Sequence, residues 1–256
     1  MPLPYKPFIS VAPNGARKTQ ADLPQLPITP EELAQEAIRC MEAGAHLFHL
    51  HVRDEHGKHS LDPERYQKAL DAIRKAVGTG LILQVTTEAV GIYTPPEQMA
   101  TVRALVPEAV SIGIRELVPD EVSKPEAKVF FDWLAQQPTQ VQFICYSATD
   151  LQYLSDLYHE NLILKPEFVL FVLGNKTGGW GQPEDLHPFL AKKKELSFDF
   201  EWTVCAFGGK ELDCMLEAVR HGGHVRIGFE NNHFMADGSI APTNAHLIEQ
   251  FKKSLA

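Results

Sequence analysis

Two histidines at strand spacing are the residues in this sequence whose types and positions best suit chemistry. The segment 48–54 reads FHLHVRD, and its two histidines, His49 and His51, alternate with apolar residues. Successive side chains of an extended strand point to opposite faces, so the two imidazoles share one face and the apolar side chains share the other. Because imidazole is the commonest metal ligand among side chains, the pair predicts a metal or catalytic site. The alternative is two packed or exposed histidines.

A carboxylate near the other end of the chain is expected to complete the ligand set. Arg226 and Glu230 fall on one face of the segment 224–232, with Glu230 toward its C-terminal end. In an eight-stranded barrel the first strand separates the eighth from the second, so Glu230 can reach both histidines across the barrel mouth. Two histidines and a carboxylate form a metal site with open positions, for which Zn²⁺ is the expected ion and Fe(II), Mn²⁺ or Co²⁺ also fit. The alternative is an ion pair of Glu230 with Arg226 or Arg53.

Further polar residues are predicted at the ends of neighbouring strands, where they could hold a small substrate. They are guanidinium, hydroxyl and carboxylate side chains: Arg53, Thr86, Thr87, Glu88, Ser111, Arg115 and Glu116. Arg53 continues the face of the two histidines and could orient a substrate carboxylate, or it could pair with Asp54 or Glu230. For the others, hydrogen bonds within the rim are the alternative.

Two glycine-rich loops could admit a ligand that carries phosphate. The segment 174–181 reads GNKTGGWG, which suits a flexible lid or a phosphate-binding surface, and the segment 207–210 reads FGGK and opens a helix. The candidates for this role are Lys176, Gly178, Gly209 and Lys210. Ordinary turn chemistry is the alternative for both loops.

The composition and charge of the chain argue against two classes of partner. The chain has 256 residues and a formal net charge of -9, with a pI near 5.6. Nucleic acids and anionic membranes select for Lys and Arg, so neither is expected as a partner. The four cysteines form no CxxC motif and are expected to be small core residues in a reducing cytosol. The sequence shows neither a signal peptide nor a membrane-spanning apolar run, so we expect a cytoplasmic protein.

Strand-like and helical segments alternate along the chain, and their number predicts the fold class. A helix over 29–44 begins with a capping box, in which Thr29 is the N-cap and Glu32 lies three residues later. The eight strands are expected at residues 8–13, 46–52, 81–87, 109–114, 141–146, 168–173, 200–206 and 224–229. Eight strands, each followed by a helix, predict a single-domain (β/α)8 TIM barrel over residues 1–256.

Five segments together resemble the β-keto acid cleavage enzyme family, whose founding activity is 3-keto-5-aminohexanoate cleavage. They span almost the whole chain: TPEELAQEAIRCMEAGAHLFHLHVRDEHG at 29–57, TT at 86–87, PEAVSIG at 107–113, VLG at 172–174 and GGHVRIGFENNHFMADGSIAPTNAHLI at 222–248. The resemblance implies a barrel that forms a homo-oligomer, a dimer or tetramer, with Zn²⁺ bound by His49, His51 and Glu230. It also implies that a β-keto acid condenses with acetyl-CoA, the cosubstrate, to give acetoacetate and a new acyl-CoA.

The chain departs from the pattern of the family that it resembles in the first loop, where Asn14 stands in place of the usual threonine, and directly after Glu230. In the family the metal-binding glutamate is followed by an aspartate that works as the base with the arginine at Arg226, whereas this chain has Asn231. An amide cannot accept a proton at neutral pH. Arg226 is therefore expected to stabilise negative charge, Asn231 to bind substrate, and Glu116 or Glu88 to act as the base. Two other functions stay open: a metal-dependent aldolase or hydrolase without CoA, and a metal-retaining member that has lost catalysis.

Overall fold

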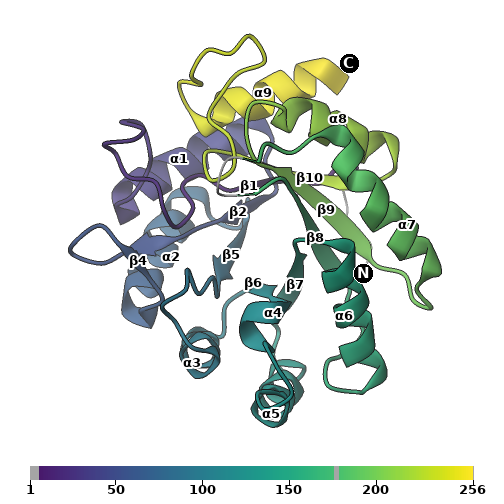
Figure 1. Ribbon diagram of the computed structural model, residues 1–256. Helices are drawn as coiled ribbons and strands as arrows, with labels where there is room; N and C mark the ends of the chain where they lie inside the picture. Colours follow the sequence, from purple (N-terminus) through teal and green to yellow (C-terminus); the bar gives the residue numbers. More distant parts are fainter. Residues whose placement is uncertain (1–5, 176–178, 256) are drawn as a thin grey trace.

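Eight parallel strands close into a barrel at the centre of the molecule (Figure 1). The computed structural model describes residues 6–175 and 179–255. The barrel strands are β1 (Ile9–Val11), β2 (Leu47–His49), β5 (Ile82–Thr86), β6 (Ala109–Gly113), β7 (Gln140–Cys145), β8 (Phe168–Leu173), β9 (Glu201–Ala206) and β10 (His224–Ile227). Around the barrel they follow the order β1-β10-β9-β8-β7-β6-β5-β2, so that β1 pairs with both β2 and β10. This closed ring confirms the predicted (β/α)8 barrel.

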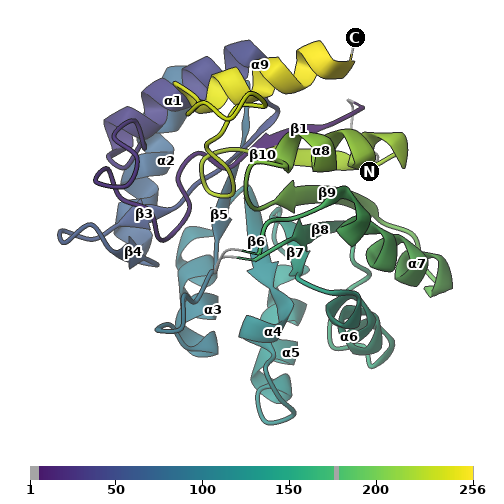
Figure 2. The same cartoon turned by 45° about the horizontal axis from the view of Figure 1, so that its top comes forward.

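Helices surround the barrel on its outer side (Figures 1 and 2). They are α1 (Pro30–Ala43), α2 (Pro63–Val77), α3 (Pro95–Leu105), α4 (Ile114–Leu117), α5 (Lys124–Leu134), α6 (Ala148–His159), the 3-10 helix η1 (Pro183–Leu186), α7 (His187–Glu195), α8 (Glu211–Arg220) and α9 (Asn244–Leu255). The capping box predicted for α1 is present. The Thr29 hydroxyl accepts from Glu32 N at 3.2 Å, and the Glu32 carboxylate accepts from Thr29 N at 2.9 Å, which satisfies two donors at the helix start.

The core lies between the strands and the surrounding helices. Phe171 on β8 stacks on Phe189 of α7, with ring centroids 4.6 Å apart, and on Trp202 of β9, at 5.5 Å. All three side chains are buried. Aromatic pairs of this kind contribute about 0.5–1.5 kcal/mol beyond the area that they bury. These contacts pack the barrel strands firmly against the surrounding helices. The loops at the barrel mouth therefore start from a rigid support.

The strand that carries the histidine pair is shorter than predicted. Of the strand expected at 46–52, β2 ends at the first histidine. Val52–Arg53 (β3) instead pairs antiparallel with His59–Ser60 (β4) in a two-stranded sheet apart from the barrel. The prediction of one continuous strand over 46–52 was therefore wrong. The strand ends early because the backbone of His51 hydrogen-bonds to the Asn14 side chain and not to a neighbouring strand.

The last barrel strand is also shorter than the predicted 224–229. Gly228 follows β10 with a φ of +141°, a value that suits glycine. The next amide, Phe229 N, donates to Asn244 Oδ1 at 2.7 Å. The chain therefore leaves the sheet at this point, and Glu230 lies on a turn beyond the strand.

The remaining expectations about the chain as a whole concern cysteines and membranes. Each of the four cysteines is buried and free of disulfide bonds, in agreement with the prediction of small core residues. Within the described part of the chain, no helix has both the length and the apolar character needed to cross a membrane.

Candidate metal centre

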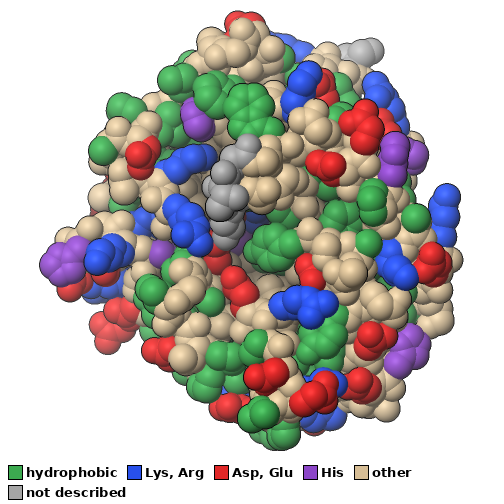
Figure 3. All heavy atoms as spheres, in the orientation of Figure 1, with side chains coloured by type: hydrophobic (Ala, Val, Ile, Leu, Met, Phe, Trp, Pro, Cys, Tyr) green, Lys and Arg blue, Asp and Glu red, His purple; other side chains and the backbone are tan. Residues whose placement is uncertain are grey.

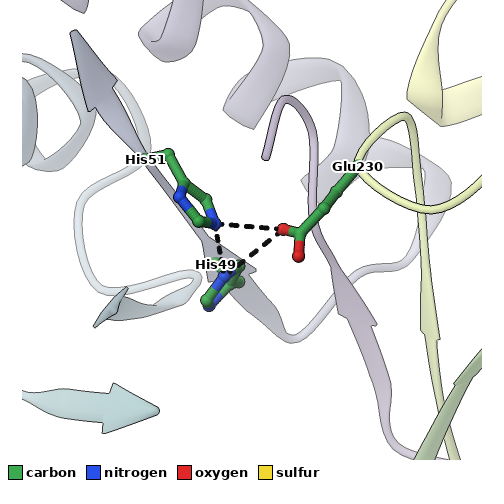
Figure 4. Close-up of side chains that lie close together, drawn as sticks. All are labelled: His49, His51 and Glu230. Atoms are coloured by element: carbon green, nitrogen blue, oxygen red, sulfur yellow. Dashed lines mark hydrogen bonds and ion pairs between the residues drawn. The ribbon is translucent and has the colours of Figure 1, made fainter. Parts of the chain in front are cut away.

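Three side chains meet at the mouth of the barrel with the spacing of metal ligands (Figure 4). The Nε2 atoms of His49 and His51 lie 3.1 Å apart, and Glu230 Oε2 lies 3.4 Å and 3.2 Å from them. Tetrahedral Zn²⁺ holds nitrogen and oxygen ligands at about 2.0–2.2 Å, which places neighbouring ligand atoms about 3.3 Å apart. The triangle therefore fits a tetrahedral ion with a further position open to substrate.

A neighbouring amide fixes which ring nitrogen of His49 faces the other two side chains. Its Nδ1 atom lies 2.9 Å from Oε1 of Gln84 on β5. An amide oxygen accepts hydrogen bonds, so Nδ1 carries the proton and Nε2 presents its lone pair to the triangle. Both side chains are almost completely buried. Gln84 is therefore a support of the ligand set that the sequence reasoning missed.

The backbone of His51 is held by the side chain of Asn14, which lies in the loop after β1. Asn14 Oδ1 accepts from His51 N at 3.2 Å, and Asn14 Nδ2 donates to the carbonyl of His51 at 2.9 Å and to that of Pro27 at 3.0 Å. Burial lowers the pKa of His51 well below its ordinary value. The imidazole is therefore neutral, which is the form that binds a metal.

Glu230 is both close to the histidines and paired with a cation. Its Oε2 faces the two imidazoles, whereas its Oε1 accepts from the Arg226 guanidinium at 3.0 Å. Burial alone would raise the pKa of the Glu230 carboxyl, but the Arg226 guanidinium holds it well below its usual range. The carboxylate is therefore ionised and ready to bind a cation. The ligand and the ion-pair alternatives are thus compatible, because they use different oxygens.

A buried carboxylate holds the turn that carries Glu230. Glu211, in the first turn of α8, accepts from Gly228 N at 3.2 Å and from Asn232 Nδ2 at 3.2 Å. Burial raises the pKa of Glu211 to about 8. Glu230 N also donates to Ala12 O at 3.0 Å. These bonds fix the backbone on both sides of the candidate ligand.

A cavity of about 250 Å³ leads from the ligand set to the surface. Its wall includes Glu230, the basic side chains of Arg17 and Lys18, and the aromatic side chains of Trp180 and Phe234. In Figure 3, basic, acidic and hydrophobic side chains surround a hollow in the middle of this face. The opening therefore combines positive charge with flat apolar surface. The sequence reasoning missed Arg17 and Lys18, although their position in the loop that follows the first strand was a signal.

Several predicted site residues do gather around the ligand set. Thr86, Glu88 and Glu116 line a small inner cavity that also includes His49, Arg226 and Glu230. Glu88 Oε2 lies 3.9 Å from His51 Nδ1. Glu116 lies on the short helix α4, and its Oε2 accepts from Ala89 N at 3.0 Å. Burial raises the pKa of Glu116.

Thr87 and Ser111, the other two predicted hydroxyl residues, lie outside both cavities at the barrel mouth. Thr87 Oγ1 donates to the carbonyl of Ser111 at 3.3 Å. The Ser111 hydroxyl is buried and has no hydrogen-bond partner among the described residues. The rim hydrogen bond expected as the alternative is thus the one observed for Thr87.

Two of the predicted cations, Arg53 and Arg115, form contacts away from the ligand set. Arg53 donates to the carbonyl oxygens of Gly15 and Lys18 and so fastens the first loop. Arg115 forms an ion pair with Asp150.

The phosphate-loop candidates are spread over different places. Lys210 pairs with Asp213 at 3.1 Å and lines a separate surface groove. Gly209 lies beneath the Trp180 ring, which a Cβ at that position would meet at 3.5 Å. Lys176 and Gly178 lie outside the described residues.

Comparisons with known proteins match nearly the whole chain. A family model described as beta-keto acid cleavage enzyme matches residues 6–256. The 3-keto-5-aminohexanoate cleavage enzyme of Fusobacterium nucleatum is 30% identical over 250 residues, which cover 96% of this chain and 89% of that protein. The 3-oxoadipate:acetyl-CoA acetyltransferase of Cupriavidus necator is 29% identical over 249 residues, which cover 95% of this chain and 86% of that protein. The solved apo structure of ObcA, at 16% identity and a TM-score of 0.69, covers 91% of this chain and 62% of that chain, and this likeness concerns the fold.

Proposed function

This chain belongs to the β-keto acid cleavage enzyme family, and we propose that it is a Zn²⁺-dependent acyltransferase that condenses a β-keto acid with acetyl-CoA. The products are acetoacetate and a new acyl-CoA. Relatives named as acetyl-CoA transferases, from Rhizobium meliloti and Cupriavidus necator, support a CoA-dependent acyl transfer.

The proposed reaction exchanges acyl groups without net oxidation. A base removes a proton from C2 of the keto acid, and the enolate attacks the acetyl-CoA carbonyl carbon, which forms a C–C bond and releases CoA thiolate. The thiolate then attacks the original ketone carbon, and the bond between that carbon and C2 breaks. The new acyl-CoA leaves, and the acetoacetate enolate takes a proton back. The base thus takes up one proton and gives one back, and neither an oxidant nor a reductant is needed.

The observation that carries the proposal is the triangle of His49, His51 and Glu230 in a chain with this family match. Bound there, Zn²⁺ would supply Lewis acidity and a template for the carboxylate and ketone oxygens of the keto acid. Arg226 is buried beside the triangle, and its fixed positive charge stabilises negative charge that develops nearby.

We assign the base to Glu116, with Glu88 as the alternative. Glu116 lines the inner cavity beside the ligand set, and its carboxylate is oriented by the amide of Ala89. Its raised pKa brings its proton affinity closer to that of a base that works near neutral pH. Glu88 Oε2 lies 3.9 Å from the outer nitrogen of His51, which is too far for a hydrogen bond but on the side from which a carboxylate would orient the imidazole.

We place the CoA thioester at the opening of the larger cavity. Arg17 and Lys18 offer positive charge to its phosphates there, and Trp180 offers a flat apolar surface. Gly209 lies beneath that ring and keeps the backbone close to it. Lys210 points to an outer groove and could contact a distal phosphate.

A metal-dependence experiment tests the proposal. The wild-type protein should contain about one divalent metal per chain by plasma emission spectrometry, and it should form acetoacetate from acetyl-CoA and one member of a β-keto acid panel. A chelator should abolish the transfer and Zn²⁺ should restore it. His49→Ala should lose the metal and the activity but stay folded, because rim residues of a barrel serve function more than stability. Its melting temperature should be close to that of the metal-free wild type, since a bound metal stabilises only the protein that holds it.

The matched control is His56→Ala, which removes an exposed histidine of the β3–β4 turn. This variant should keep both metal and activity. Unchanged metal content in His49→Ala would contradict the metal assignment. Consumption of a keto acid without any use of acetyl-CoA would instead support an aldolase or a hydrolase.

A further inference from the structure

The turn after β10 carries an amide whose orientation is fixed by its neighbours. Asn231 Oδ1 accepts from the Arg226 guanidinium at 2.9 Å. A guanidinium has donors only, so the oxygen must face Arg226 and the NH2 group must face away. The Asn231 side chain is only 4% exposed, and its Nδ2 is buried without a hydrogen-bond partner among the residues described. A buried donor of this kind is costly to leave unsatisfied, so it points to a bound group that would satisfy it.

The backbone around this amide is held as firmly as its side chain. Asn231 N donates to Gly228 O at 2.9 Å, and Gly208 N donates to the carbonyl of Asn231 at 3.1 Å. The next residue, Asn232, donates to the buried Glu211. The orientation of the Nδ2 donor is therefore fixed before any oxygen binds to it.

The position of Asn231 indicates which oxygen this donor would meet. The residue directly follows Glu230 and lines the larger cavity together with Phe207 and Gly208. It thus lines the same cavity as Glu230 and as Trp180, beside which we place the CoA thioester. The keto acid oxygens would have the metal as their partner, whereas the thioester oxygen needs a donor of its own.

We propose that Asn231 Nδ2 is the oxyanion-binding donor for the thioester, an inference that rests on the proposed acyl transfer. As the enolate carbon bonds to the thioester carbon, the carbonyl π pair moves onto the oxygen, which accepts the hydrogen bond from Nδ2. The pair then returns to re-form the carbonyl as the C–S bond breaks and CoA thiolate leaves. In this chain the position therefore serves charge stabilisation and not proton removal.

The substitution Asn231→Asp tests the inference closely. Aspartate has the same shape and keeps the acceptor for Arg226, but at neutral pH it has no donor and adds a negative charge beside the oxyanion. We expect kcat to fall by about 100- to 1000-fold, the usual effect of losing one oxyanion donor, with KM values within a few-fold. Asn231→Ala should also lose activity. The matched control, Asn161→Asp at the end of α6, makes the same change at an exposed position and should keep full activity.

A binding measurement separates this inference from the proposed function. The trifluoromethyl ketone analogue of acetyl-CoA is hydrated in water to a neutral, tetrahedral gem-diol, whose shape and oxygens resemble the addition intermediate. Because Asn231→Asp removes one hydrogen-bond donor to these oxygens, calorimetry should show about tenfold weaker binding to this variant. Free CoA should bind both proteins equally. Equal affinity for the ketone, or a kcat in Asn231→Asp at or above that of the wild type, would overturn the inference. A wild type that forms no acetoacetate would instead defeat the proposed function.

Discussion

The substitution Gln84→Leu tests the proposal that Gln84 prepares His49 to bind a metal. In the folded protein His49 Nδ1 donates to Gln84 Oε1 at 2.9 Å, in surroundings that exclude water. Without that acceptor, the metal-free imidazole can move its proton to Nε2. The metal-bound imidazole cannot, because Nε2 is then the ligand atom. The lost hydrogen bond therefore weakens the bound state selectively.

The size of this effect follows from the cost of a buried donor without a partner. That cost is about 1–3 kcal/mol, and losses of outer support typically weaken metal affinity by about 10- to 100-fold. We expect the Zn²⁺ dissociation constant of Gln84→Leu to rise within this range, measured by competition with a fluorescent chelator. The control is Gln142→Leu. This variant removes Gln142 Oε1, which accepts from Gln84 Nε2 at 3.4 Å, but it keeps Gln84 Oε1 as the acceptor for His49. It should therefore bind Zn²⁺ as tightly as the wild type. If Gln84→Leu bound Zn²⁺ as tightly as the wild type and this control, the reasoning would be refuted.

Three further predictions concern the mouth of the barrel. Gly208→Ala should lower the melting temperature, because Gly208 has a φ of +90°. It should also raise the KM for acetyl-CoA, because a Cβ there would lie 2.3 Å from Trp180 and displace that ring. An unchanged KM would contradict the proposal that the thioester binds beside Trp180. Glu211→Gln should gain stability relative to the wild type as pH rises from 5 to 8. Burial raises the pKa of Glu211 from its ordinary value of 4.5 to about 8, so across this window the folded state keeps a proton that the unfolded state releases, and the wild type loses stability. A melting-temperature difference that did not move with pH would contradict this sign. Arg17→Ala should raise the KM for acetyl-CoA more than that for the keto acid, and the difference should shrink at high salt; a salt-independent effect would exclude charge pairing.

The fold was predictable because its signals are local. Hydrophobic runs and helix caps repeat along the chain, and Thr29 caps α1 in the way that its neighbours indicate. The ends of strands were less predictable, since they depend on distant partners. His51 is held by Asn14, which lies 37 residues earlier in the chain, and no local pattern announces that contact.

The candidate ligand set was found from residue type, whereas its supports were not. Histidines two residues apart are a specific signal, but a glutamine in a strand or a glutamate at a helix start is common. The signal available for Gln84 was a polar residue inside an apolar strand, which suggests a buried partner. Charge alone was a poor guide among the cations. Arg115 and Lys210 pair with nearby carboxylates, while the cavity wall is formed by cations from the first loop.

Isotope labelling tests the central claim, the transfer of acyl groups between a β-keto acid and acetyl-CoA, most directly. The Zn²⁺-loaded protein would be incubated with its keto acid and with acetyl-CoA labelled with ¹³C at the carbonyl, and the products followed by NMR. The label should appear at C3 of acetoacetate, while the new acyl-CoA stays unlabelled, because its acyl group comes from the keto acid. Label found in free acetate, or unlabelled acetoacetate, would contradict the account.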